Sequence, residues 1–270
     1  MSWRRQFRSD GGGALSIVQT AERFSGRVES YRQHRPRYPD AVVDVLAAEC
    51  SLTTASLSAD IAAGTGLLTE KLLERGFPVI AVEPNDEMRA ACELLTAQFP
   101  QLRCVSGTAE ATGQPSSSFD LVTVAQAMHW FDLGRARKEF ARILRPGGWC
   151  AVVYNERKIG GDSFHDGYEH LLRNFGIDYA KVQRQHLTVE KIEQFFAPSP
   201  MKRAIFPNEQ LLALEALKGR ILSSSYMPKA DHPQCAAMQA AIRELFKKHQ
   251  QDGHVRLEYD CAVYYGRLEK

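Results

Sequence analysis

The stretch LSADIAAGTGLLTEKLLERG, residues 57–76, carries the clearest structural signal of the sequence. Its first six residues form a short apolar run that predicts a strand, and a glycine turn with Gly64 and Gly66 follows at once. An apolar pattern of helical spacing starts at Leu67 and stops at Gly76, a typical helix end. A strand that runs through a glycine turn into a helix usually cradles a nucleotide-like cofactor.

Strand candidates alternate with helical patterns from residue 57 to about residue 155. After the first strand they are PVIAVE (78–83), LRCVSG (102–107), FDLVTVAQA (119–127) and GGWCAVVYNE (147–156). This alternation predicts parallel strands joined by right-handed crossovers, and hence a doubly wound sheet.

The last segment, residues 254–268, alternates cleanly between apolar and polar residues. It predicts an antiparallel strand at the sheet edge, with MKRAIF (201–206) as its partner. Helical patterns at 164–176, 188–196, 208–222 and 235–250 indicate a cap over the carboxyl edge of the sheet. The predicted fold class is therefore α/β: a Rossmann-like, doubly wound, mostly parallel seven-stranded sheet with an antiparallel edge strand and a helical cap.

This pattern divides the chain into three regions. Residues 1–22 are expected to form a flexible tail, and residues 23–156 a cofactor-binding core with a helical lead-in. Residues 157–270 would supply the helical cap and the final strands of the same domain. The tail carries Arg4, Arg5 and Arg8, so a targeting segment there remains an open alternative.

The composition excludes several classes of partner. The chain has 270 residues, of which 44% are hydrophobic and 24% charged, and its net charge is only +2. This balance gives no general attraction for nucleic acid or an anionic membrane, and no apolar run approaches the ~20 residues of a membrane span. The six cysteines are widely spaced without a C-x-x-C pair. We therefore expect reduced thiols, a cytoplasmic protein and no metal site.

The glycine turn fits neither a dinucleotide nor a P-loop. A G-x-G-x-x-G fingerprint would place Ala62, Gly64 and Leu67 at its glycines, and no G-K-[ST] follows. What remains is Asp60 on the first strand and Glu83 at the end of the second, where a carboxylate can accept both ribose hydroxyls. These features indicate a nucleoside with an amino-acid tail. Alternatively, Asp60 could cap the neighbouring backbone and Glu83 could be a solvent-facing acid.

Four motifs, in this order, carry a family resemblance: DIAAGTG, VEPNDEM, GTAEATGQPSSSFDLVTVAQAMHWFD and LRPGGWCAVV. With them, residues 24 to about 155 resemble the class I S-adenosylmethionine-dependent methyltransferases of the methyltransferase type 11 group. Within that family the chain is similar to the ubiquinone-biosynthesis-like and trans-aconitate-like enzymes. The stretches ESYRQHRPRYP and AMHWFD point to the trans-aconitate-like enzymes.

The resemblance implies S-adenosylmethionine as cofactor and assigns roles to individual residues. It places Asp60, Ala62, Gly64 and Gly66 at the methionine part, Glu83 at the ribose, Pro84 and Asn85 beside the adenine, Thr108 and Ala109 near its amino edge, Gln126 facing the cofactor, and Tyr31 and Arg35 toward the methionyl carboxylate. Surface packing of the lead-in is the alternative for Tyr31 and Arg35. The chain departs from the family at Ala62, usually glycine, and at Thr108, often aspartate.

The acceptor side is less clearly marked. His129 follows the fourth strand and is placed to reach the acceptor, as a base or a hydrogen-bond donor, or else it is a packed structural histidine. Trp130 and Phe131 are expected to pack between sheet and cap. In the segment GRILSSSYMP, Arg220, Ser225 and Tyr226 are candidate substrate contacts. Arg220 could bind an acid bidentately or be an ordinary cation near a helix end.

The predicted function is methyl transfer from S-adenosylmethionine to a small-molecule acceptor, with a carboxylic acid as one option. The expected partner is this small molecule, with no nucleic acid and no membrane span, and the sequence leaves the oligomeric state open. One alternative is a methyltransferase that acts on protein or nucleic acid. The other is a non-catalytic S-adenosylmethionine-binding protein, because a fold does not fix a function.

Overall fold

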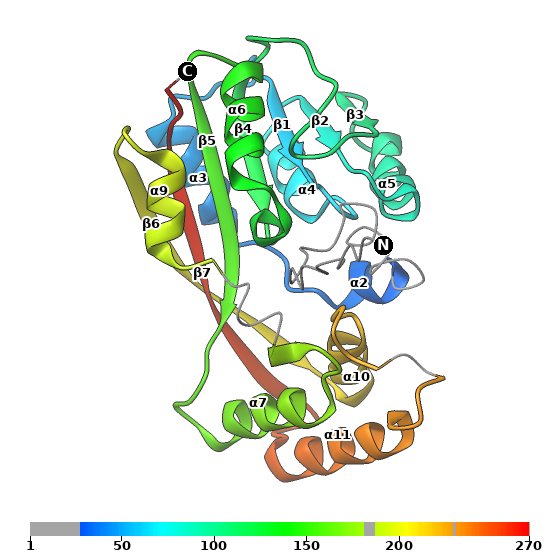
Figure 1. The fold of residues 1–270 in the computed structure, drawn as a ribbon. Coiled ribbons are helices and arrows are strands. Elements are labelled where there is room, and N and C mark those ends of the chain that lie inside the picture. The colour runs from blue at the N-terminus through cyan, green and yellow to red at the C-terminus, as the bar shows by residue number, and fades with distance from the viewer. Residues whose placement is uncertain (1–27, 181–186, 229–230, 270) are drawn as a thin grey trace, which may run out of the picture.

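The fold is built on a seven-stranded sheet, in which the strands lie side by side in the order β3-β2-β1-β4-β5-β7-β6 (Figure 1). The computed structural model describes residues 28–180, 187–228 and 231–269, so the expected tail at 1–22 lies outside the described residues. The strands are β1 Ser58–Ile61, β2 Val79–Val82, β3 Leu102–Val105, β4 Phe119–Ala125, β5 Leu144–Arg157, β6 Met201–Leu212 and β7 Val255–Arg267. β1 to β5 pair in parallel, while β7 is antiparallel to both of its neighbours. The predicted fold class is confirmed.

Helices flank the sheet on both faces and also lie beyond its carboxyl edge. The helices are α2 Val28–His34, α3 Asp40–Glu49, α4 Leu67–Glu74, α5 Asp86–Glu93, α6 Leu133–Ile143, α7 Ser163–Phe175, α9 Val189–Phe196, α10 Leu214–Leu222 and α11 Cys235–His249, with one-turn helices η1 Leu94–Ala97 and η2 Met128–Trp130. Among the described residues, no helix has both the length and the apolar character that crossing a membrane requires. All six cysteines are free thiols, as expected.

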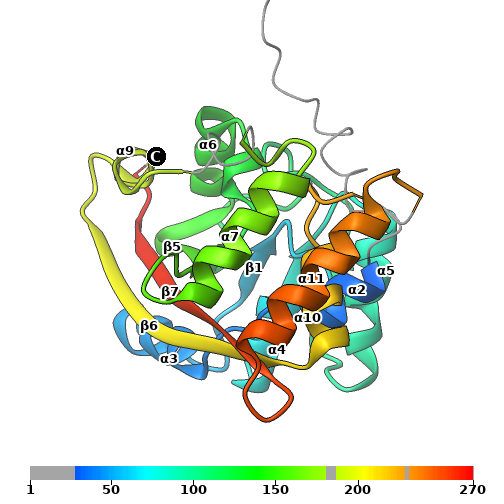
Figure 2. The same cartoon turned by 90° about the horizontal axis from the view of Figure 1, so that it is seen from below.

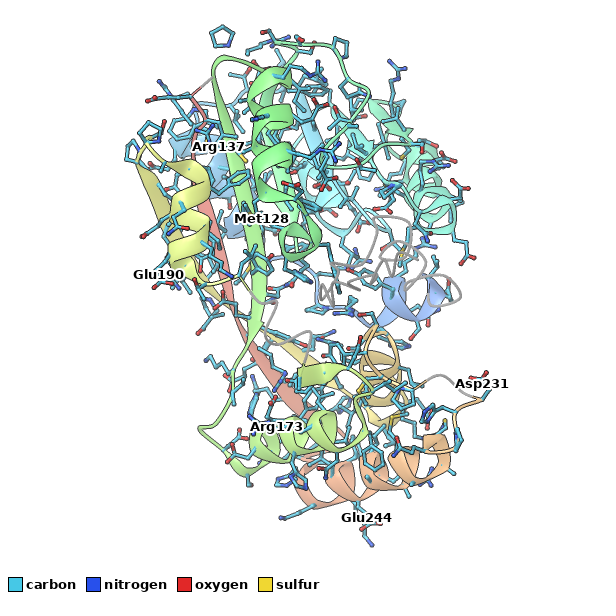
Figure 3. The ribbon with its side chains drawn as sticks, in the orientation of Figure 1. Met128, Arg137, Arg173, Glu190, Asp231 and Glu244 are labelled. Carbon is cyan, nitrogen blue, oxygen red and sulfur yellow. The ribbon has the colours of Figure 1, made fainter. Side chains whose placement is uncertain are left out.

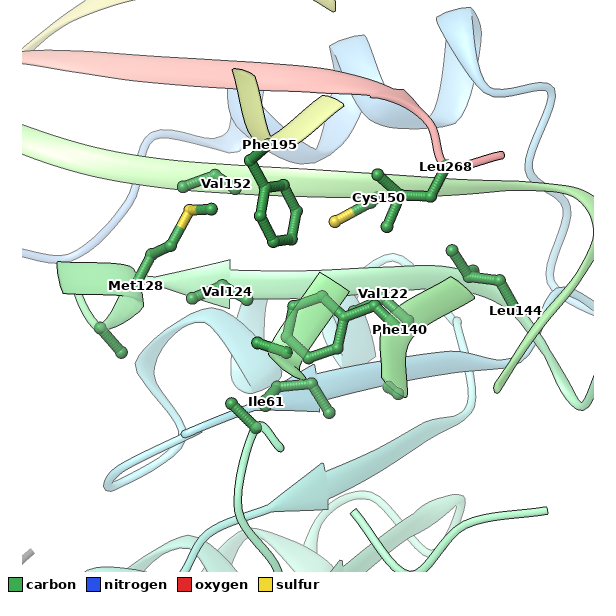
Figure 4. Packing of buried hydrophobic residues seen from close by; sticks show 14 of the residues in the cluster. Ile61, Val122, Val124, Met128, Phe140, Leu144, Cys150, Val152, Phe195 and Leu268 are labelled. Carbon is green, nitrogen blue, oxygen red and sulfur yellow. The ribbon is translucent and has the colours of Figure 1, made fainter. Parts of the chain in front are cut away.

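Two buried clusters fix the sheet between its helices. On one face, α3 and α4 bury Leu46 and Leu72 against the strands. On the other face, Phe140 of α6 and Phe195 of α9 join Val124 of β4 in a second cluster, with 6.0 Å between the two phenyl centroids (Figure 4). Burying one such aromatic ring stabilises the fold by roughly 1.5–3 kcal/mol. The expectation that residues 188–196 belong to the cap is therefore wrong, because α9 covers a face of the sheet.

The two last strands differ from the sequence-based expectation in position and length. β7 lies between β5 and β6, so the edge strand is β6 and not the final segment. Residues 208–212, which we expected to be helical, continue β6 and pair with β7 as far as Val255. Their leucine-rich sequence has good helix formers, but pairing with a long neighbouring strand overrides that local preference.

The long strands β5, β6 and β7 extend past the short parallel strands and carry a second helical layer. Figures 1 and 2 show α7, α10 and α11 at their far ends, with α7 and α11 side by side. A third cluster, which includes Tyr168, Leu217, Ile242 and Leu257, holds these three helices on β6 and β7. We call α7, α10 and α11 the cap helices.

The lead-in helix α2 docks on the cap helix α10. Ser30 Oγ donates to the carbonyl of Gly219 at 3.0 Å, and Arg35 donates to the carbonyl of Ser223 at 2.9 Å. A side chain at Gly219 would collide with His34, since an added Cβ would lie 2.1 Å from its ring. Glycine at position 219 therefore lets α2 lie between the sheet and the cap.

The turn after β1 is shaped by two glycines and by Asp60. Gly64 and Gly66 have φ values of +59° and +87°, which favour glycine. Asp60 is buried, with Oδ2 accepting from Thr69 Oγ1 at 2.6 Å and Oδ1 from Thr123 Oγ1 at 2.8 Å. The backbone N–H of Thr69, in the first turn of α4, also bonds this carboxylate. Asp60, on β1, thus caps α4. It accepts from the Thr69 N–H at the start of this helix, because the N-cap residue Gly66 has no side chain that could do so.

Gly66→Ala should destabilise the fold more than Gly64→Ala. An added Cβ at Gly66 would lie 2.8 Å from both Cys92 Sγ and Leu95 Cδ1, whereas at Gly64 nothing lies within 4 Å. Left-handed backbone strain alone costs about 1–2 kcal/mol, and overpacking at Gly66 adds about 1–3 kcal/mol. Urea denaturation of both variants measures the difference. Equal losses of free energy of unfolding would contradict the packing at Gly66.

The free energy of unfolding of Asp60→Asn, relative to that of the parent protein, should be higher at pH 7.5 than at pH 4. Burial raises the pKa of Asp60 to about 6, although the hydroxyls of Thr69 and Thr123 and the Thr69 N–H favour the carboxylate. Between about pH 4 and 6 the folded protein keeps a proton that the unfolded chain has lost, so stability falls as pH rises through 6. The asparagine variant escapes this loss, which amounts to about 3 kcal/mol. Urea denaturation of the variant and the parent protein at both pH values tests this prediction. If the two proteins differ by the same free energy of unfolding at both pH values, the raised pKa of the buried Asp60 carboxyl is contradicted.

Candidate active site

A first cleft opens where the strand order reverses, beyond the carboxyl ends of β1 and β4. Ligands of open α/β sheets bind at this position. The cleft encloses about 740 Å³, including its open mouth. It is lined by Tyr31, Ala62, Gly64, Glu83, Pro84, Met88, Thr108, Ala109, Glu110, Ala125, Gln126, Ala127, Trp130 and Phe131. Eight residues predicted for the cofactor are in this lining: Tyr31, Ala62, Gly64, Glu83, Pro84, Thr108, Ala109 and Gln126.

Glu83 is the most strongly held acid of this cleft. Its Oε2 accepts from the backbone N–H of Gly64 at 2.9 Å, and its Oε1 accepts from that of Asn85 at 2.8 Å. Only 6% of the residue is exposed, so it is not the solvent-facing acid of the alternative interpretation. Burial raises the pKa of Glu83, and the two N–H donors oppose that rise. The carboxylate is thus fixed in orientation, with lone pairs left to accept from a ligand's hydroxyls.

Two lining residues have left-handed backbone conformations, which residues other than glycine rarely adopt. Ala62, after β1, has a φ of +55°, and Gln126, after β4, has a φ of +57°. Ala62 therefore adopts the left-handed conformation that a glycine would adopt at this position without strain, and its side chain makes this conformation strained. The Gln126 amide donates to the Asn155 carbonyl at 3.2 Å, which ties this turn to β5.

Four residues predicted for the cofactor lie outside the lining of the first cleft. Asp60 sits behind the turn, because its carboxylate caps α4. Gly66 faces Cys92 and Leu95. The side chain of Asn85 is turned inward, because it accepts from the Met88 N–H at 2.9 Å as the N-cap of α5. Arg35, the remaining predicted residue, lines a second cleft.

The second cleft lies between the sheet and the cap helices and encloses about 1840 Å³, including its mouth. It shares Tyr31, Gln126 and Trp130 with the first cleft, so the two clefts are adjacent. All residues predicted for the acceptor side line it: His129, Arg220, Ser225 and Tyr226. In Figure 3, Met128, which precedes His129, lies on the side of the molecule toward the cap helices that carry Arg173 and Glu244.

The second cleft is lined by three arginines, Arg35, Arg157 and Arg220, and by one acid, Glu156. Arg220 is 7% exposed and donates only to neutral oxygens, those of Tyr259 at 3.1 Å and Ser224 at 3.3 Å. Arg35 donates to the Ser223 carbonyl, and its Nε is buried without a hydrogen-bond partner. Burial and then the nearby charge of Arg220 lower the pKa of Arg35. Within residues 28–180, 187–228 and 231–269, neither guanidinium forms an ion pair with a carboxylate.

A third arginine of this cleft is already neutralised. Arg157 bonds Glu169 at 2.5 Å and Tyr179 at 3.2 Å, with the ring of Tyr168 4.9 Å from its guanidinium carbon. Both side chains of the ion pair are largely buried. This pair ties the end of β5 to α7. The cleft's remaining charges are the cations Arg35 and Arg220 and the carboxylate of Glu156.

The described residues hold one group of possible metal ligands, Asp162, His165 and Glu258. His165 is 2% exposed. Its Nδ1 bonds Asp162 Oδ1 at 2.9 Å, and its Nε2 accepts the backbone N–H of Glu258 at 3.1 Å. Because both ring nitrogens are engaged, the group acts as a cross-link between α7 and β7.

Several lining residues were not expected to face a ligand. Trp130 and Phe131 were expected to pack between sheet and cap, yet both line the first cleft. Met88 of α5 adds an apolar wall, and Tyr179 belongs to the second cleft. Position alone could have suggested the aromatic pair, because it follows Gln126 at the end of β4. Met88 and Tyr179 carry no such signal.

The donor set of the first cleft fits S-adenosylmethionine. A fixed carboxylate suits a ribose diol, and the apolar residues Met88, Ala109 and Phe131 suit the face of a purine. The open space at Gly64 lets a ligand approach the backbone.

Comparison with known proteins agrees with this fit. Residues 59–152 match the family model of a methyltransferase domain. The chain is 43% identical over 134 residues to an uncharacterized methyltransferase of Mycobacterium tuberculosis (strain H37Rv), covering 50% of this chain and 52% of that protein. It is 27% identical over 252 residues to an uncharacterized methyltransferase-like protein of Schizosaccharomyces pombe, covering 91% of this chain and 95% of that one.

The matched region spans only about half the length of the first curated relatives. A solved structure of a candidate type II methyltransferase from Anaeromyxobacter dehalogenans has a TM-score of 0.61 at 24% identity, covering 87% of this chain and 98% of that one, and shows the shared fold. The segment that the family model matches contains β1 to β4, most of β5, and Gly64, Glu83 and Gln126 of the first cleft. Residues 59–152 are therefore similar to a methyltransferase domain, and the first cleft, which they largely line, fits S-adenosylmethionine.

Proposed function

We propose that the chain transfers a methyl group from S-adenosylmethionine to a small-molecule carboxylic acid. The observation that carries this proposal is the junction of the two clefts at Tyr31, Gln126 and Trp130. A cofactor in the first cleft and an acceptor in the second would meet there, and alignment of the two reactants is the main requirement for such a transfer. When bound, the cofactor supplies an electrophilic methyl group.

On the cofactor side, Glu83 would accept hydrogen bonds from both ribose hydroxyls. Pro84 and Asn85 would flank the adenine, with Asn85 acting through its backbone because its side chain caps α5. Thr108 and Ala109 would meet the amino edge of the base. Tyr31 would approach the methionyl carboxylate from the lead-in helix.

The methionine part would lie along the turn after β1. Ala62 and Gly64 line the cleft there, while Asp60 and Gly66 would hold the turn from behind. Gln126 would meet this part of the cofactor from the end of β4. Its strained backbone and its bond to Asn155 support a fixed position.

On the acceptor side, Arg35 and Arg220 favour an anion. A buried cation is costly unless it is paired, and a carboxylate between the two guanidinium groups would supply that pairing with charge-assisted hydrogen bonds. Ser225 and Tyr226 line the same cleft and would contact the rest of the acceptor. His129 would reach the acceptor from the end of β4.

The position of the second cleft favours a small acceptor. It lies under the cap helices, which would exclude water and limit the size of the acceptor. The net charge of +2 gives no field for a nucleic-acid acceptor. A protein or nucleic-acid acceptor and a non-catalytic binding protein are the outcomes that would overturn the proposal.

Glu83→Ala should weaken S-adenosylmethionine binding by about 10- to 150-fold. The loss corresponds to roughly 1.5–3 kcal/mol, the range for hydrogen bonds to a charged group. Calorimetric titration of the variant beside the parent protein measures the change. Glu87→Ala, which removes an exposed acid from the start of α5, is the matched control and should bind normally. Unchanged affinity in Glu83→Ala would defeat the ribose assignment.

Arg220→Gln should lower kcat/KM for an acidic acceptor at least tenfold and leave the Kd of S-adenosylmethionine within about twofold. The reason is the loss of a buried charge that bonds the acceptor, worth about 1.5–3 kcal/mol. Lys218→Gln removes a charge from the same helix outside the cleft and serves as control. Steady-state kinetics on a series of small acids measures kcat/KM of both variants and of the parent protein.

Two results would count against the acidic acceptor. One is full activity of Arg220→Gln on acids, with a melting temperature equal to that of the parent protein. The other is a parent enzyme that prefers protein or nucleic acid. Arg35→Gln adds a further distinction, because a rise in KM for the acid assigns Arg35 to the acceptor and a rise in the cofactor Kd assigns it to the methionyl carboxylate.

A further inference from the structure

His129 stands beside a buried tyrosine at the wall of the second cleft. It belongs to η2, the one-turn helix that follows β4, and its ring lies 4.5 Å from that of Trp130 between centroids. Its Nδ1 is 3.3 Å from the hydroxyl of Tyr154, which β5 places next to the end of β4. Tyr154 is 3% exposed, so its hydroxyl must find its partners inside the protein.

The hydroxyl of Tyr154 also faces the backbone of η2. The first N–H groups of a helical turn have no partner within the turn. Those of Met128 and His129 bond the Tyr154 oxygen, and they oppose the rise that burial causes in the pKa of Tyr154. A phenol oxygen that accepts N–H donors keeps its own hydrogen for another acceptor. Nδ1 of His129 is the acceptor that the structure places beside it.

We propose that Tyr154 is a positioning residue that holds neutral His129 with its proton on Nε2. A ring whose Nδ1 accepts the tyrosine hydrogen has its single N–H on the other nitrogen. His129 is then a hydrogen-bond donor to the acceptor and not a general base. This inference decides between the two roles that the sequence left open for His129.

The inference rests on the proposed function and agrees with its chemistry. A carboxylate acceptor forms the new C–O bond with its own electron pair, the bonding pair of the old S–C bond remains on sulfur, and no proton is released. No base is therefore required at position 129. An N–H donor in the same cleft as Arg35 and Arg220 would instead help to orient the anion before transfer.

The tautomer can be read by NMR without any acceptor. In the full-length protein labelled with ¹⁵N-histidine, long-range ¹H–¹⁵N correlations distinguish the protonated ring nitrogen from the bare one. The His129 signals are identified by their loss in His129→Gln. We expect Nδ1 to be the bare nitrogen in the parent protein, and the Nδ1 signal to shift in Tyr154→Phe. A proton on Nδ1 of the parent protein would overturn the proposal, even if Tyr154→Phe failed to fold.

Kinetics gives an independent readout once an acid acceptor is found. Glutamine at position 129 keeps an N–H donor but cannot take up a proton. We expect kcat of His129→Gln to fall no more than about tenfold, and kcat of His129→Leu to fall further because the donor is lost. A fall of about 10²- to 10⁴-fold in His129→Gln, the range for loss of a general base, would overturn the proposal. If no acid is methylated, the proposed function fails while the NMR result still decides the tautomer.

Discussion

The buried carboxylate of Glu83 is the contact on which the cofactor site depends. It joins the end of β2 to two other segments, the turn after β1 through Gly64 and the start of α5 through Asn85. A buried acid without such donors would be costly, and the turn would lose the acceptor of its N–H group. Because the protein itself fixes this carboxylate, it needs little rearrangement to accept a ribose.

The acceptor side results from unequal strand lengths. β1, β2 and β3 are short, whereas β5, β6 and β7 continue beyond them. The cap helices pack on these longer strands and face the carboxyl edge where the first cleft lies. The lead-in helix α2 joins both sides, because Tyr31 lines both clefts and Arg35 bonds the Ser223 carbonyl at the end of α10. In the proposed arrangement, Arg35 and Arg220 would bring positive charge near the methyl donor, which would suit an acceptor that arrives as an anion.

The sequence predicts those features of the site that have a local cause. The strand–turn–helix around Gly64 and the acid at Glu83 both follow from short patterns. The role of Asp60 depends on Thr123, a residue of another strand, and could not be read locally. The same holds for β6, whose length is set by pairing with β7, and for α9, whose apolar face could equally have packed on the cap.

The most direct test of this account is a methyl-transfer assay with S-adenosylmethionine that carries a labelled methyl group. Small carboxylic acids, phenols, a protein mixture and nucleic acid are offered separately, and the products are followed by mass spectrometry. We expect a labelled methyl ester of a small acid and no label in the polymers. Label found only in protein or nucleic acid, or cofactor binding without transfer to any acceptor, would contradict it.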